Sequence, residues 1–251
     1  MLGKKTRLFS EQERKVTAYH EMGHALVGHY TDQDAEVHKI SIISRGQALG
    51  YTISLPREDR YLTTRSALMD QLAAILGGRA AEELVFNEVT TGAANDLEKV
   101  THTAKQMIMR YGMSEKLGPR VLGRNQDMPF LGREMASEPD YSEEMAREID
   151  DEIRRVIEEA HVRARKVLEE HLEELHRLSG ILVERETIDK DQFLRLMDGA
   201  EEAEVFPEEA PARPEQAKPK TEEKRTRVPK PKPFPLPGQA MQPPPPEGAK
   251  G

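Results

Sequence analysis

Three residues near the N-terminus have the types and the spacing of a zinc site that could hydrolyse a peptide bond. His20, Glu21 and His24 form the pattern HExxH within the pentad HEMGH. On a helix, residues four apart lie on one face about one turn apart, so both imidazoles can bind one Zn²⁺. Zinc lowers the pKa of a bound water, and Glu21 would accept its proton as that water attacks a carbonyl. The pattern predicts a zinc-dependent peptidase with Glu21 as the general base.

A simpler interpretation of the pentad is a pair of surface histidines on an acidic helix. The residues Ala18, Ala25 and Leu26 around it favour a largely buried helix instead. Buried imidazoles need partners, and a shared metal ion would be one. We therefore prefer the zinc site.

A catalytic zinc site needs a third protein ligand, and the pentad does not contain one. The extended motif HExxHxxGxxH would place a histidine where this chain has Tyr30. His29 is five residues after His24 and points away from the shared face. The third ligand must come from another segment, and spacing alone leaves several acidic candidates: Glu82, Glu83, Glu88, Asp96 and Glu98.

The elements that must position these residues begin with a helix and a hairpin. Ser10 and Glu13 form a capping box that would start the helix carrying the pentad. The segments 38–44 and 50–55 are rich in β-branched residues and predict a β-hairpin that ends at Pro56.

Two further helices are expected before residue 112. The first begins at Thr63 or Thr64 and is interrupted by the pair Gly77–Gly78. The second is capped by Asn95 or a neighbour and stops before Gly112.

The longest amphipathic pattern runs over residues 141–179, with Gly180 just beyond its end. Core packing or subunit contact is the expected role of this helix. Asp189 and Gln192 form a last capping box. The fold class is therefore α+β and predominantly helical, with one small sheet.

Composition excludes several classes of function. The chain has no cysteine, which excludes disulfides, thiolate zinc sites and a thiol nucleophile. No apolar run approaches a membrane span, so we expect this chain itself to be soluble. Its net charge of −8 argues against nucleic acid as a partner.

The same composition divides the chain into parts. Residues 201–251 hold 13 of the 17 prolines and few apolar residues, so we expect a disordered tail. A flexible segment, 1–9, precedes a peptidase domain, 10–200. That domain would comprise a catalytic part, 10–112, an irregular connector, 113–140, and C-terminal helices, 141–200.

Four ordered motifs over about residues 8–198 resemble the peptidase domain of the FtsH-type membrane-anchored AAA proteases. They are AYHEMGHALVG around the pentad, GGRAAEELVF at 77–86, TTGAANDLEKVT at 90–101 and YGMSEKLGP at 111–119. The family usually has alanine where this chain has Met22. Because Met22 is neither ligand nor base, we expect intact zinc binding and perturbed activity at most.

The resemblance implies a HExxH zincin-like fold with one Zn²⁺ per chain. It assigns the third ligand to Asp96 and a supporting carboxylate to Glu82, while Glu21 remains the base. It also favours β-strand pairing of a polypeptide substrate along the segment Gly50, Tyr51, Thr52, Ile53 and Ser54.

Family resemblance further implies a homohexamer in protein quality control, on the cytoplasmic side of a membrane. ATP and Mg²⁺ would act only through an ATPase module, and the membrane only through anchor segments, both outside this chain. The chain has no G-x-x-x-x-G-K-[ST] phosphate loop, so we expect a C-terminal piece of such a protease or a stand-alone relative.

Two alternatives remain. The chain could be a catalytically weak or inactive zinc-bound module for assembly or partner binding, or a helical interaction domain without metal. A metal determination would identify the domain without metal, and an exchangeable water on the metal would distinguish the peptidase from the inactive zinc-bound module.

Overall fold

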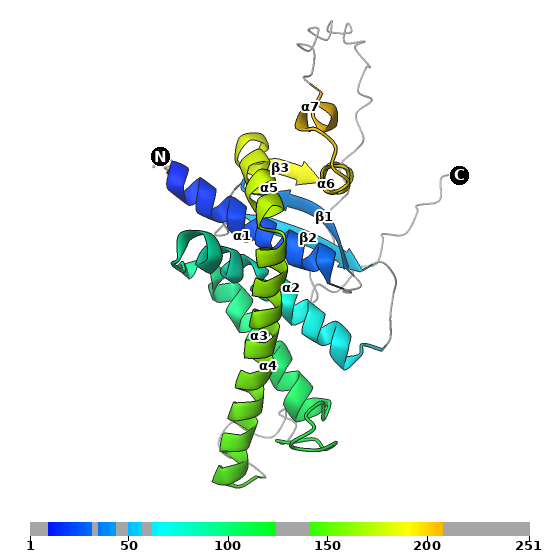
Figure 1. Cartoon of the computed structure of the whole chain (residues 1–251). Coiled ribbons are helices and arrows are strands. Elements are labelled where there is room, and N and C mark those ends of the chain that lie inside the picture. The colour runs from blue at the N-terminus through cyan, green and yellow to red at the C-terminus, as the bar shows by residue number, and fades with distance from the viewer. Residues whose placement is uncertain (1–9, 32–34, 44–49, 57–61, 124–140, 208–251) are drawn as a thin grey trace, which may run out of the picture. The chain divides into compact units, whose positions relative to one another are not determined.

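The computed structural model describes residues 10–31, 35–43, 50–56, 62–123 and 141–207, which all belong to one compact unit. A small antiparallel sheet lies against a set of helices, as the expected α+β class requires (Figure 1). In chain order the elements are α1 (Glu11–Tyr30), β1 (Ala35–Ser41), β2 (Tyr51–Pro56), α2 (Arg65–Phe86), a 3₁₀ turn (Thr91–Ala93), α3 (Ala94–Lys105), a π-helical turn (Gln106–Arg110), α4 (Glu143–Glu170), α5 (Leu172–Arg185), β3 (Thr187–Asp189), α6 (Lys190–Met197) and α7 (Glu202–Val205).

Helix α1 carries the pentad through the core. Its predicted capping box is present, because the Ser10 hydroxyl accepts from the Glu13 N–H at 3.1 Å and the Glu13 carboxylate accepts from the Ser10 N–H at 2.9 Å. Ala18 and Leu26 are fully buried, which confirms the buried helix that the apolar flanks predict. Met22 is fully buried too, so this longer side chain fills core space beside the site.

The predicted hairpin is present as β1 and β2, which pair antiparallel with Ile40 opposite Thr52. Strand β1 begins at Ala35, three residues earlier than expected, and the connecting residues 44–49 lie outside the described part. A third strand, β3, was not predicted and pairs with the other side of β1. Within the described sheet the strand order is β2-β1-β3, so β2 lies at an edge.

The expected interruption at Gly77–Gly78 is wrong, because α2 runs unbroken through both glycines. The reason is a helix crossing. A Cβ at Gly23 of α1 would lie 2.4 Å from the Gly77 carbonyl oxygen, and a Cβ at Gly77 would lie 2.5 Å from that of Gly23. Glycine here permits the two backbones to touch, and packing of α1 on α2 outweighs the low helix propensity of glycine.

The expected single helix over 141–179 is also wrong, since the chain forms α4 and α5 with a break at His171, whose ψ is 32°. The Tyr30 ring of α1 stacks on the His171 ring at 3.6 Å, and its hydroxyl donates to Glu174 at 2.7 Å. Contacts with a distant helix therefore accompany the break. Helix α5 then continues past Gly180 and ends at Arg185, followed by the C-cap residue Glu186, which has a φ of 61°.

Gly180 is consequently an interior helical residue with open space around it. A Cβ there would have no heavy atom within 4 Å. Gly180→Ala should therefore raise the free energy of unfolding by about 0.5–1 kcal/mol, because alanine restricts the unfolded chain and favours the helix. Urea unfolding should show a higher midpoint at an unchanged slope. Gly199→Ala, at a φ of 88°, should instead lower the midpoint.

Two smaller expectations differ from the structure. Helix α3 begins after Ala93 with no side-chain cap, so the expected cap by Asn95 or a neighbour is wrong. Residues 202–205, assigned by composition to the tail, form α7 with Val205 buried.

The remaining tail, 208–251, and most of the expected connector, 124–140, lie outside the described residues. None of the helices in the described ranges is long and apolar enough to cross a membrane.

Candidate metal centre

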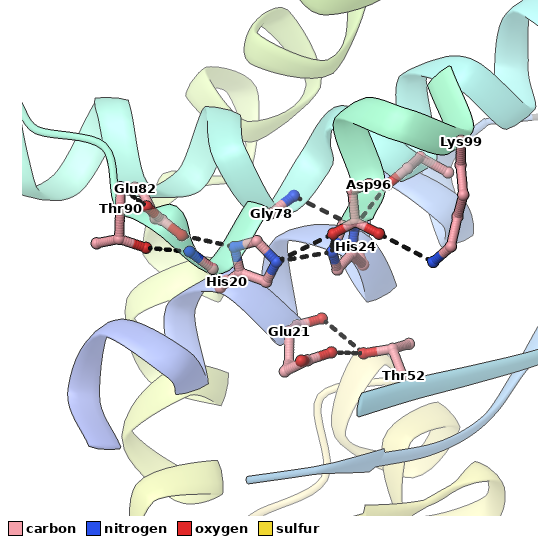
Figure 2. A network of polar contacts seen from close by, with 11 residues as sticks. His20, Glu21, His24, Thr52, Gly78, Glu82, Thr90, Asp96 and Lys99 are labelled. Carbon is pink, nitrogen blue, oxygen red and sulfur yellow. Dashed lines mark hydrogen bonds and ion pairs between the residues drawn. The ribbon is translucent and has the colours of Figure 1, made fainter. Parts of the chain in front are cut away.

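The two histidines of α1 and Asp96 of α3 converge on one point (Figure 2). The Nε2 atoms of His20 and His24 are 3.1 Å apart, and Asp96 Oδ2 lies 3.3 Å from the first and 3.2 Å from the second. Within the described ranges, no other group of three histidine, cysteine or acidic side chains could share a metal ion. Of the acidic candidates, Asp96 is the one beside both histidines.

The other ring nitrogen of each histidine has an acceptor of its own. His20 Nδ1 lies 2.6 Å from Glu82 Oε1, and His24 Nδ1 lies 2.9 Å from the Ala74 carbonyl oxygen. A carbonyl oxygen can only accept, so His24 Nδ1 carries the proton and cannot also accept from the Gly78 N–H, which lies 3.3 Å away. When the rings are neutral, both Nε2 atoms therefore direct lone pairs toward Asp96.

Three acceptor atoms this close together need a proton or a metal ion between them. Around a tetrahedral zinc ion with bonds of about 2.0–2.1 Å, neighbouring ligand atoms are about 3.3 Å apart. The separations of 3.1, 3.3 and 3.2 Å match this spacing. Two imidazoles and a carboxylate are also ligands that catalytic zinc uses. The residues present fit a zinc ion.

Glu82 lies behind His20 on the side away from this point. It is 1% exposed, and its second oxygen accepts from the Thr90 N–H at 2.7 Å. Burial alone would raise the pKa of Glu82, but the hydrogen bonds from His20 and Thr90 outweigh it and lower the pKa. A carboxylate in this position fixes the imidazole and increases its basicity.

The charges at the site set the protonation of its ligands. Burial by itself lowers the pKa of His20, but the hydrogen bonds to Asp96 and Glu82 and the nearby Glu21 charge outweigh it and raise the pKa to about 9. Burial likewise opposes ionisation of Asp96, yet the contacts with His20, His24 and Lys99 hold the pKa of Asp96 well below its usual range. The Lys99 ammonium lies 3.1 Å from Asp96 Oδ1.

A consequence is that zinc and a proton compete for His20 Nε2. With a pKa of about 9, metal-free His20 is protonated at neutral pH and must lose that proton to bind metal. Lower pH therefore favours the competing proton, and we expect the apparent zinc affinity to rise about tenfold per unit from pH 7 to pH 9. Zinc titration against a competing chelator at several pH values would measure this slope. An affinity independent of pH over this range would contradict it.

Glu21 lies on the neighbouring face of α1, toward β2 (Figure 2). The residue is 7% exposed, and its Oε2 accepts from the Thr52 hydroxyl at 2.6 Å. The structure thus places Glu21 next to the three converging side chains but outside their group.

The segment considered for substrate pairing lies on β2, where Gly50 precedes the strand and Tyr51, Thr52, Ile53 and Ser54 belong to it. Ile53 is 36% exposed. Because β1 occupies one side of β2, the other side is a sheet edge within the described residues. The edge runs beside Glu21 through Thr52 (Figure 2).

Sequence reasoning missed several residues of the site. Gly78 is the clearest, because a Cβ there would lie 2.6 Å from His24 Nε2 and 2.7 Å from His20 Nε2. From the sequence, the pair Gly77–Gly78 suggests a helix break. No local sequence pattern distinguishes a glycine that breaks a helix from one that leaves room for a neighbouring imidazole ring. Thr52 is expected only as part of the strand that pairs with substrate, and its contact with Glu21 is not predicted; Lys99 carries no signal of its own. Of the remaining acidic candidates, Glu83 instead pairs with His161, and two are exposed, Glu88 and Glu98.

Comparison with known proteins agrees with this geometry. The family model described as Peptidase family M41 matches residues 7–196. The chain is 61% identical over 237 residues to ATP-dependent zinc metalloprotease FtsH 1 of Conexibacter woesei, covering 94% of this chain and 36% of that protein. It is 51% identical over 195 residues to ATP-dependent zinc metalloprotease FtsH of Rubrobacter xylanophilus, covering 78% of this chain and 30% of that protein. It is 46% identical over 196 residues to ATP-dependent zinc metalloprotease FtsH of Bacillus subtilis, covering 78% of this chain and 31% of that protein.

These relatives confirm the resemblance to the FtsH-type proteases, and the chain spans about a third of their length. The family model covers most of the chain and includes all three converging side chains. The chain therefore belongs to peptidase family M41.

Proposed function

We propose that this chain is a zinc-dependent endopeptidase domain with one Zn²⁺ held by His20, His24 and Asp96. The observation that carries this proposal is the spacing of three acceptor atoms, 3.1 to 3.3 Å apart, which matches that of ligands around a tetrahedral zinc ion. In both histidines the second ring nitrogen, Nδ1, already has a hydrogen-bond acceptor. Membership of peptidase family M41 supports the peptidase activity.

In this mechanism each residue has a separate task. When bound, zinc acidifies a water molecule and polarises the substrate carbonyl. Glu82 keeps the proton of His20 on Nδ1, so that Nε2 stays available as a ligand. Glu21 takes one proton from the attacking water and passes it to the nitrogen of the departing amine, which regenerates the carboxylate.

A polypeptide substrate would bind as an added strand on the edge of β2 that no described strand occupies. Main-chain hydrogen bonds of this kind tolerate many sequences, which suits unfolded polypeptides. The same strand contacts Glu21 through Thr52, so a paired substrate would lie near the base.

The whole protein's activity is a further part of the proposal. The relatives are named ATP-dependent zinc metalloproteases, and this chain matches about a third of their length. We infer that an ATPase module outside this chain delivers unfolded or membrane-extracted polypeptides. The assembly would be a homohexamer anchored in a membrane through other segments, with this domain on the cytoplasmic side.

Metal removal tests the core of the proposal. We expect about one zinc per chain and cleavage of casein that stops when zinc is chelated and returns with added Zn²⁺ but not Mg²⁺. A hydroxamate should inhibit by binding the metal. Tightly bound zinc with neither cleavage nor hydroxamate binding would instead favour the inactive assembly module.

A further inference from the structure

The carboxylate of Glu21 lies against the start of strand β2. The Thr52 hydroxyl lies 2.6 Å from Glu21 Oε2 and 3.2 Å from the carbonyl oxygen of the same residue. Among the residues that the structure describes, these are the two hydrogen-bond contacts of this hydroxyl. The single hydroxyl hydrogen is donated to the carboxylate oxygen, which is the nearer acceptor, and the carbonyl oxygen is at most a weaker, shared acceptor (Figure 2).

Gly50 lies close to the other oxygen of the same carboxylate. A Cβ at Gly50 would lie 2.7 Å from Thr17 Cγ2, 2.8 Å from Glu21 Oε1 and 2.9 Å from Glu21 Cγ. Gly50 lies directly before β2 and Thr52 is the second residue of the strand, so both contacts with Glu21 come from the beginning of β2. One oxygen therefore packs against the Gly50 backbone while the other accepts a hydrogen bond.

We propose that Thr52 is a positioning residue that fixes the orientation of Glu21, with Gly50 providing the space for this orientation. This inference rests on the proposed role of Glu21 as general base. A base must hold its accepting oxygen within hydrogen-bond reach of the reacting water, and small displacements cost rate. A hydroxyl-to-carboxylate bond is among the stronger hydrogen bonds and can supply that restraint.

The arrangement also links substrate and base. Strand β2 would receive the substrate at its outer edge and holds Glu21 with an inward side chain. The same strand would then position both the substrate and Glu21, so the distance between the substrate carbonyl and the base would stay constant if the strand moved. Main-chain pairing does not use the Thr52 hydroxyl, so its loss should affect turnover more than binding.

Two substitutions separate the hydroxyl from the shape of the side chain. Thr52→Val keeps the shape and removes the donor, whereas Thr52→Ser keeps the donor. In the full chain loaded with zinc, we expect Thr52→Val to lower kcat on a fluorogenic peptide about 10- to 100-fold, with KM within about twofold. Thr52→Ser should stay within a few-fold of the wild type. Bound zinc should be unchanged in both.

A third variant and a control complete the experiment. Gly50→Ala should also lower kcat, because the new methyl group would lie 2.7 Å from Thr17 Cγ2 and 2.8 Å from Glu21 Oε1, and the flexible Glu21 side chain moves away more easily than the β-branched Thr17. Thr187→Val is the matched control, since Thr187 is a half-buried strand residue whose hydroxyl bonds to Ser41 at 2.9 Å, away from the site. It should keep wild-type kcat.

Two outcomes would count against different steps. If Thr52→Val keeps wild-type kcat while Glu21→Gln is inactive, the positioning role is wrong and the proposed function stands. The same holds if Thr52→Ser loses as much kcat as Thr52→Val. If the wild type shows no zinc-dependent cleavage, or Glu21→Gln remains active, the proposed function fails and the positioning role with it.

Discussion

Glu21→Gln should abolish peptide cleavage while leaving zinc bound. Glutamine has nearly the shape of glutamate and can still accept from the Thr52 hydroxyl, so the fold around the site should persist. It cannot accept a proton from water, and loss of a general base costs about 10²- to 10⁴-fold in rate. Casein or peptide cleavage and bound zinc, measured on the same preparations, would check both parts.

Glu169→Gln is a suitable control, because Glu169 is exposed on α4 and, among the described residues, forms an ion pair with the exposed Arg165 at 2.8 Å. Such surface pairs contribute little to stability. This variant should cleave like the wild type. Substantial cleavage by Glu21→Gln, with zinc bound, would exclude Glu21 as the base.

Gly78→Ala should largely remove zinc binding although alanine favours a helix. Its Cβ would lie 2.6 Å from His24 Nε2 and 2.7 Å from His20 Nε2, the two atoms that face the metal position. The rings cannot turn aside without losing their contacts with Glu82 and Ala74. We expect the zinc affinity to fall about 100-fold, as for overpacking next to a ligand.

Chelator competition would measure that loss, and thermal unfolding without metal would show whether the fold persists. Gly180→Ala provides the matched control, because it adds the same methyl group to a helix interior with no neighbour within 4 Å. Its zinc affinity should be unchanged. Equal affinities for Gly78→Ala and the wild type would mean that α1 and α2 move apart at little cost.

The sequence predicts the parts of the site that depend on local periodicity. His20, Glu21 and His24 lie on α1 as the helical repeat requires, and the capping box marks the helix start. Spacing alone did not select Asp96, because the third ligand depends on how α3 packs. Only the family resemblance favoured Asp96, and its role as a ligand remains a prediction.

Long-range packing explains what the sequence did not predict. The break at His171 is accompanied by a stacked ring from Tyr30, which lies far away in the chain. Strand β3 has only three residues and forms because β1 offers an edge to it. The continuity of α2 through Gly77 reflects a neighbour, Gly23, that no local propensity includes.

The contact between Gly23 and Gly77 also limits how this motif can change over time. A first methyl group at either position would collide with the opposite carbonyl at 2.4 or 2.5 Å. Once the helices have separated to admit it, a second methyl group at the other position costs less, so the two substitutions are strongly epistatic. The fourth letter of the pentad is thus constrained by a partner 54 positions away in the numbering, independently of the chemistry that constrains His20, Glu21 and His24.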